Sequence, residues 1–205
     1  MAITTYAELK TAVAKWSWNT DETEFEASVG DFITLAEARF NRELRIAAME
    51  ASATITLTGS AGSLPADYLE FRRVVANTSP TTPLELVTPD FASGEYGTTY
   101  SGYPAHFSII GSTITVYPST TATVGLRYYQ KIPALSDSNT TNWLLTAHPD
   151  IYLFAACVEG ADFSRDQEQL AKFEARYQAA VKALEGSDTG ARYARATMRV
   201  SGPTP

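Results

Sequence analysis

The sequence predicts an α+β protein: a mainly helical bundle of about four helices, a β-rich insertion between helices 2 and 3, and an extended C-terminal tail. Apolar residues recur at helical spacing near both ends of the 205-residue chain. Between residues 52 and 133, Thr, Val, Ile, Gly and Pro replace the helix formers. After residue 186 almost no core-forming residue remains.

These observations divide the chain into four expected regions. The first and third are helix pairs of one bundle, the second is the insertion, and the last is a flexible arm. Their expected bounds are 1–51, 52–135, 136–185 and 186–205.

The first helix is expected from Tyr6 to about Trp16. Thr5 and Glu8 have the spacing of a capping box, in which the hydroxyl and the carboxylate each accept a backbone N–H. Tyr6, Leu9, Val13 and Trp16 then share one helical face. This spacing is typical of a helix.

The second helix is expected from about Glu24 to Ala48. Its apolar residues recur at steps of three and four, while three charged residues project away from that stripe. The apolar residues are Phe25, Val29, Phe32, Ala36 and Phe40, and the charged residues are Glu37, Arg42 and Arg45. Arg39 and Glu43 are four residues apart, so they form either an ion pair within the helix, which we favour, or a contact with a neighbouring subunit.

The insertion is predicted to consist of short strands. They are expected at 53–57, 72–76, 106–110, 113–117 and 123–130. Residues 59–62 should turn the chain. The tight turn at 110–113 makes a hairpin of residues 106–117 the clearest of these predictions.

Two helices are expected after the insertion. The third should run from about Pro149 to Phe163, with Pro149 in its first turn. The fourth should run from about Gln167 to Glu185 and end at Gly186. Asp150 should lie near the positive end of the third helix, so His148–Asp150 is read as a helix entrance and not as a catalytic group.

Composition excludes several classes of function. The chain has a net charge of −7, which disfavours a general nucleic-acid binder. It has neither a secretory-signal pattern at its amino terminus nor an apolar run of membrane-span length, so we expect no membrane partner. Cys157 is the single cysteine, which rules out an intramolecular disulfide.

Patterns for catalysis and for cofactor binding are weak. No phosphate loop, dinucleotide fingerprint or Gly-x-Ser-x-Gly elbow occurs. His106, His148 and Cys157 do not have the spacing of a zinc site, so we expect no metal and no cofactor. Cys157 is read as a buried apolar residue. The carboxylate pairs Asp67–Glu70 and Glu159–Asp162 have the reach for acid–base work on a glycan, but acidic proteins commonly contain such pairs.

The tail carries a local basic pattern. Arg192, Arg195 and Arg199 would share one face if residues 189–200 became helical on binding. They could then contact DNA phosphates or acidic side chains of a protein partner, or they could simply keep the tail soluble.

The order of several short motifs resembles the head-to-tail adaptor proteins of tailed bacteriophages. The motifs extend from the second helix to the third. They are residues 32–45 (FITLAEARFNRELR), 64–69 (LPADYL), 103–104 (YP), 110–118 (IGSTITVYP), 126–135 (LRYYQKIPAL), 143–145 (WLL) and 149–153 (PDIYL).

The resemblance implies a structural protein of the virion neck, made in the bacterial host cytoplasm, and not an enzyme. It implies a ring, typically dodecameric, that binds the portal protein and a downstream tail or nozzle protein and lets double-stranded DNA pass without sequence-specific binding. It also assigns portal binding to the C-terminal arm. The residues expected there are Arg192, Tyr193, Arg195, Met198, Arg199 and Val200.

An acidic lining would let DNA slide through such a ring, whereas a lining of Arg42, Arg45, Arg72 and Arg73 would contradict that expectation. Two alternatives stay open. One is another neck component, a head-completion or tail-terminator protein. The other is a tail accessory protein that hydrolyses peptidoglycan with a carboxylate pair.

Overall fold

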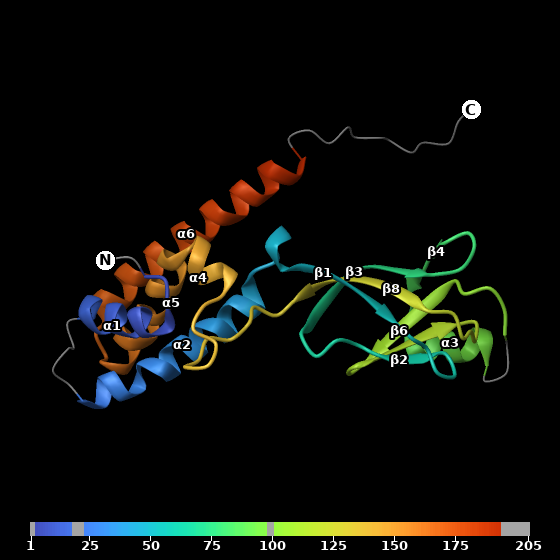
Figure 1. The fold of residues 1–205 in the computed structure, drawn as a ribbon, viewed down its shortest axis with the longest axis horizontal. Coiled ribbons are helices and arrows are strands. Elements are labelled where there is room, and N and C mark those ends of the chain that lie inside the picture. Colours follow the sequence, from blue (N-terminus) through green and yellow to red (C-terminus); the bar gives the residue numbers. More distant parts are fainter. Residues whose placement is uncertain (1–2, 18–22, 98–100, 194–205) are drawn as a thin grey trace. The chain divides into compact units, whose positions relative to one another are not determined.

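The structure, a computed structural model, describes residues 3–17, 23–97 and 101–193 (Figure 1). Within these residues it contains six α-helices and two four-stranded sheets, which confirms the α+β class. The chain divides into two compact units. Residues 1–46 and 132–205 make up the helical unit, and residues 47–131 make up the β unit.

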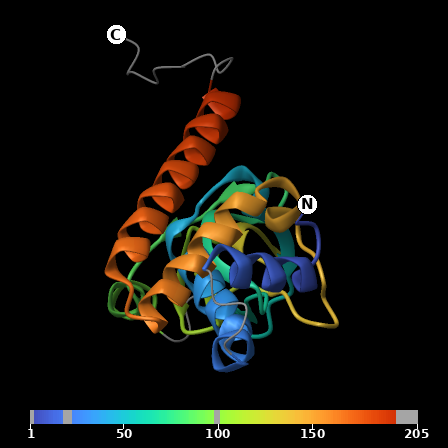
Figure 2. The same cartoon turned by 90° about the vertical axis from the view of Figure 1, so that its left-hand side faces the viewer.

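Five helices belong to the helical unit. Their bounds are α1 Tyr6–Trp16, α2 Thr23–Glu43, α4 Trp143–Ala147, α5 Pro149–Phe163 and α6 Gln167–Tyr193. Helix α5 contacts each of the other four (Figure 2). Most of its side chains are buried. The short α4 is an addition to the four helices that the sequence predicts.

The local helix signals act as expected. The Thr5 hydroxyl accepts the Glu8 N–H at 3.3 Å, and the Glu8 carboxylate accepts the Thr5 N–H at 3.0 Å, which completes the capping box. Pro149 and Asp150 lie in the first turn of α5. These local contacts satisfy backbone groups that a helix start leaves unpaired.

Helix α2 is shorter than predicted and ends at Glu43 instead of near Ala48. The Arg45 guanidinium donates to the backbone oxygens of Asn41 and Leu44, at 3.0 and 2.6 Å. Because these carbonyls are satisfied by a side chain, the helix can end there, and Leu44 and Ile46 are buried in a segment without regular structure.

Helix α6 is longer than predicted. It continues through Gly186 to Tyr193, so Gly186 does not end it, and the first eight residues of the expected arm are helical. A glycine inside a helix costs only about 1 kcal/mol of helix stability relative to alanine. The helical residues on both sides of Gly186 can offset this cost.

The β unit is a sandwich of two sheets. The first sheet has the strand order β1-β8-β3-β4 and the second has β2-β7-β6-β5; all pairings are antiparallel except that of β5 with β6. The strands are β1 Glu50–Ile55, β2 Ala61–Ser63, β3 Tyr68–Ala76, β4 Thr82–Pro83, β5 Glu85–Leu86, β6 His106–Ile110, β7 Thr113–Tyr117 and β8 Val124–Gln130. A 3-10 turn, Ala47–Met49, precedes β1.

Apolar side chains alternate with outward-facing ones along the strands, and the inward-facing set forms the core between the two sheets. Val74 and Leu126 of the first sheet and Phe107, Ile114 and Val116 of the second belong to one buried cluster. The predicted hairpin is confirmed as β6 and β7, with Gly111 at φ 58° in its turn. The strand predicted at 53–57 instead begins at Glu50 and ends at Ile55.

One helix of the β unit was not predicted. Helix α3, Pro89–Tyr96, begins where the Thr88 hydroxyl accepts the Phe91 N–H at 3.3 Å and Pro89 occupies the first turn. The Tyr96 hydroxyl lies 2.5 Å from Nδ1 of His106, and the Tyr96 ring stacks on that of Tyr117. Helix α3 therefore covers the outer face of the second sheet.

Candidate docking surfaces

The structure places only part of the predicted binding segment. Arg192 and Tyr193 lie in the last turn of α6. Arg195, Met198, Arg199 and Val200 lie outside the described residues. The six residues are therefore not brought together as a described site, and α6 is the element from which the segment extends.

Helix α6 is anchored through its first half. Phe173, Tyr177 and Val181 are buried, whereas the side chains from Lys182 to Gly190 are exposed or half-buried. Within the helical unit, the second half of α6 extends beyond α5 (Figures 1 and 2). The packed half can hold the helix while its distal end remains available to a partner.

An ion-pair network fixes α6 to α2. Arg39 of α2 donates to both carboxylate oxygens of Glu174, at 2.8 and 2.6 Å, and its Nε donates to Glu43 at 2.9 Å. Tyr177 donates its hydroxyl proton to the other oxygen of Glu43 at 2.7 Å, and the Arg39 guanidinium lies 4.2 Å from the centre of the Tyr177 ring. The predicted pair of Arg39 with Glu43 exists, but it is part of a contact between two helices.

The charges in this network shift pKa values in the directions expected for a stable cluster. Hydrogen bonds to Glu174 raise the pKa of Arg39, and the same bonds lower the pKa of Glu174. Burial, together with the hydrogen bond to Glu43, raises the pKa of Tyr177. The network therefore remains charged on Arg39 and Glu174 and neutral on Tyr177 at neutral pH.

A second polar cluster lies inside the helical unit around Glu37. Its side chain is buried, at 6% exposure, although the sequence analysis placed it away from the apolar stripe. Its Oε1 accepts the Leu135 N–H at 2.8 Å and the Tyr152 hydroxyl at 3.1 Å. Asn142 donates to Tyr152 and to the Pro133 carbonyl, at 2.6 and 2.7 Å.

This Glu37 cluster ties residues 132–142 to α2 and α5. Burial raises the pKa of Glu37, and burial with the adjacent Glu37 carboxylate raises the pKa of Tyr152. The segment has little regular structure of its own, so these side-chain bonds satisfy backbone groups that it would otherwise bury unpaired. The cluster therefore holds this segment against the helices.

The candidate catalytic groups lie in different surroundings. Cys157 is fully buried, and burial raises the pKa of its thiol to about 12. Asp67 accepts a hydrogen bond from Tyr128 at 3.0 Å, and burial raises the pKa of Glu159. Among the described residues, no group of three or more His, Cys, Asp or Glu side chains is placed to hold a metal ion.

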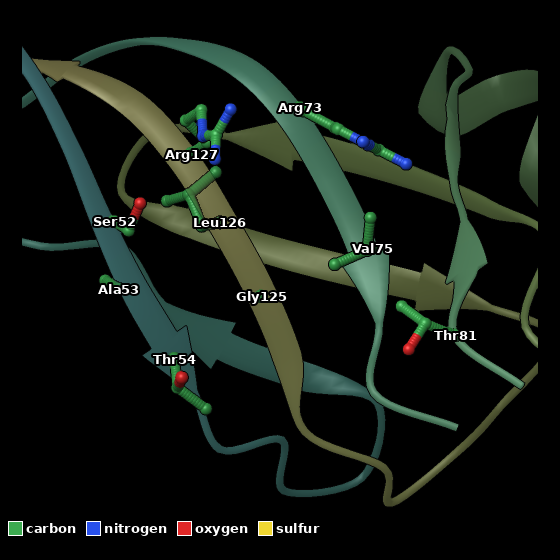
Figure 3. A pocket seen from close by; sticks show the side chains of 9 residues that line it. All are labelled: Ser52, Ala53, Thr54, Arg73, Val75, Thr81, Gly125, Leu126 and Arg127. Carbon is green, nitrogen blue, oxygen red and sulfur yellow. The ribbon is translucent and has the colours of Figure 1, made fainter. Parts of the chain in front are cut away.

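A shallow groove that the sequence patterns did not predict lies on the outer face of the first sheet. It has a volume of about 380 Å³ and is lined by residues of β1, β3 and β8 together with Thr81 (Figure 3). Arg73 and Arg127 are exposed register partners on β3 and β8. Alternation along residues 124–128 is the sequence signal that would place Arg127 on the outward side, but only the pairing of β3 with β8 shows that it lies beside Arg73.

Comparison with known families identifies one match. The family model described as SU10 adaptor protein matches residues 4–201, which includes the helical and the β unit. No curated protein matches the chain. In the described part of the chain, no helix combines the length and the apolar character that crossing a membrane requires.

Proposed function

Because this chain belongs to the SU10 adaptor protein family, a family of phage head-to-tail adaptors, we propose that it forms a ring beneath the portal and joins the DNA-filled capsid to the tail. The ring is typically twelvefold, and the protein is a structural component of the virion neck that also contacts a downstream tail or nozzle protein. The main support for this proposal is the family match over residues 4–201, because that match covers nearly the whole chain. No cofactor and no enzymatic step is part of it.

The C-terminal arm is the proposed portal-binding element. The buried first half of α6 and the Arg39–Glu174 ion pair hold the base of the arm, while Arg192 lies in the last turn of the helix. Residues 194–205 contain few core-forming side chains, so they can take the shape of a partner surface on binding.

The ring would continue the DNA channel. A chain with a net charge of −7 supports a channel that repels the DNA backbone and lets the genome slide. A channel lined by Arg42, Arg45, Arg72 and Arg73 would bind DNA phosphates and contradict this part of the proposal.

Negative-stain electron microscopy with the portal ring encoded in the same genome tests the proposal. We expect extra ring density beneath the portal for the full chain. Truncation after Glu185 should abolish that density while leaving the protein folded, because residues 186–190 are exposed or half-buried and the sequence after them has few core-forming residues. Truncation after Tyr193, which keeps α6 complete, separates the helix end from the rest of the arm.

Two outcomes would contradict the proposal. Absence of any complex at physiological salt would argue against a portal adaptor. Undiminished binding by both truncated chains would show that the arm does not dock. Unfolding of the shorter chain, measured by circular dichroism, would show that residues 186–193 belong to the core of the helical unit.

A further inference from the structure

The outer groove of the first sheet places two positive charges side by side. Arg73 and Arg127 are direct register partners across β3 and β8. Like charges in this position destabilise a sheet. Within the described residues neither side chain forms an ion pair, in contrast to Arg72, which pairs with Glu50.

The floor of the groove is open because β8 carries a glycine. A Cβ on Gly125 would lie 2.9 Å from Cγ2 of Val75, so a side chain has no room there. Glycine inside a strand often marks a close approach, and here the approaching group is the Val75 side chain of the neighbouring strand β3. The exposed hydroxyl groups of Ser52 and Thr54 line one side of the groove (Figure 3).

The opposite side of the β unit has complementary properties. No Lys or Arg occurs between residues 74 and 126, whereas Glu85, Asp90 and Glu95 lie on β5 and α3 with exposed side chains. Leu86 and Phe91, next to Glu85 and Asp90 in the sequence, are 54% and 52% exposed. We call these five residues together the acidic face.

We infer that the groove of one copy receives the acidic face of the next copy around the ring. This inference rests on the proposed ring and names its subunit interface. Arg73 and Arg127 would pair with carboxylates of the neighbouring α3, and the Phe91 ring would lie against a guanidinium. A contact between two different surfaces of the same chain is heterologous, and repetition of it closes a ring when the rotation permits.

A second copy fits the groove better than DNA does. Two arginines form few phosphate contacts, and DNA bound in the groove would leave Leu86 and Phe91 exposed to water. The acidic face supplies carboxylates together with an aromatic and an aliphatic side chain, the mixture typical of a protein interface.

Charge exchange tests the interface directly. We would prepare a groove variant with Arg73→Glu and Arg127→Glu, a face variant with Asp90→Lys and Glu95→Lys, and a chain with all four changes. Lys15→Glu with Lys182→Glu is a matched control, because both lysines are exposed on the helical unit and the change in net charge equals that of the groove variant. Sedimentation velocity, with and without the portal ring, measures self-association, and circular dichroism verifies folding.

Each two-residue variant should lose self-association by about tenfold or more, because opposed charges become like charges. A mixture of the two variants should recover it, since both kinds of contact in an alternating ring are then complementary. The four-change chain should recover it alone, and the control should resemble the unchanged chain.

The inference would be overturned by unchanged association of the groove and face variants, by failure of the mixture and the four-change chain to recover, or by loss in the control. Groove variants that assemble normally but release DNA would assign the groove to DNA instead. If unchanged chains bind the portal only as separate copies, the proposed interface between copies is wrong, but the portal assignment still holds. The two proposals can therefore fail separately.

Discussion

Arg39 on α2 and Glu174 on α6 form a two-point ion pair, with Nη1–Oε2 and Nη2–Oε1 distances of 2.8 and 2.6 Å, although 135 residues separate them in the sequence. The pair joins the N-terminal helices to the helix that carries the proposed arm. Its geometry matches the planar guanidinium to the carboxylate, which a lysine cannot reproduce.

Replacing Arg39 with Ala should destabilise the helical unit by about 2 kcal/mol, because Glu174 and Glu43 lose the donors that hold them beside each other. Urea unfolding measures the change. Arg39→Lys is the matched control, since it keeps the charge but not the two-point geometry, and it should recover only part of the loss. If Arg39→Ala unfolds at the same urea concentration as the unchanged protein, the ion pair has no stabilising role.

Replacing Glu37 with Gln should preserve or increase stability at neutral pH. Gln can accept both hydrogen bonds without the cost of burying a charge, whereas Glu37→Ala leaves the Leu135 N–H and the Tyr152 hydroxyl without their acceptor and should cost about 2–3 kcal/mol. The measurement is the free energy of unfolding of each variant.

The same comparison has a defined pH dependence. The pKa of Glu37 is raised above its ordinary value of 4.5, so its protonated form favours folding below that value and the contribution is lost as pH rises through the folded pKa. The unchanged protein should therefore lose stability relative to Glu37→Gln as pH rises from about 4.5. A difference that does not vary with pH would show that Glu37 is not titrating in the core.

Cys157 should resist thiol reagents in the folded protein. Its thiol is fully buried with a pKa of about 12, so almost no thiolate exists at pH 8. Labelling with a disulfide reagent should proceed only after addition of denaturant, at the rate of unfolding. Rapid labelling of the native protein would show that local opening of α5 exposes the thiol. Cys157 would then be a candidate reactive group.

Replacing Arg192, Arg195 and Arg199 together with Ala should weaken portal binding by about tenfold at physiological salt, the effect of a few surface ion pairs. The effect should shrink at high salt. Lys15, Arg165 and Lys182, each exposed on the helical unit, provide a control triple replacement. Equal binding by the two triple variants would leave shape and apolar contacts of the arm as the basis of docking.

Local sequence signals predicted several elements because their causes are local. The capping box of Thr5 and Glu8 acts through neighbouring backbone groups, and the turn at Gly111 requires only one residue with positive φ. Alternation likewise indicated most strands of the insertion. The helical periodicity of residues 25–40 predicted α2 but not its end, because the Arg45 contacts with backbone carbonyls compete with continuation of the helix.

By itself, the sequence determined the α+β class, the capping and turn positions and the resemblance to phage adaptors. Periodicity and short-range hydrogen bonding depend only on residues near one another in the sequence, and the order of motifs is a property of the sequence itself. Tertiary structure alone decided the burial of Glu37, the pairing of Arg39 with Glu174 and the juxtaposition of Arg73 with Arg127. Each of these depends on which distant segments pack or pair. Helical and strand periods give the face on which a residue lies but not the partner that the fold brings to that face.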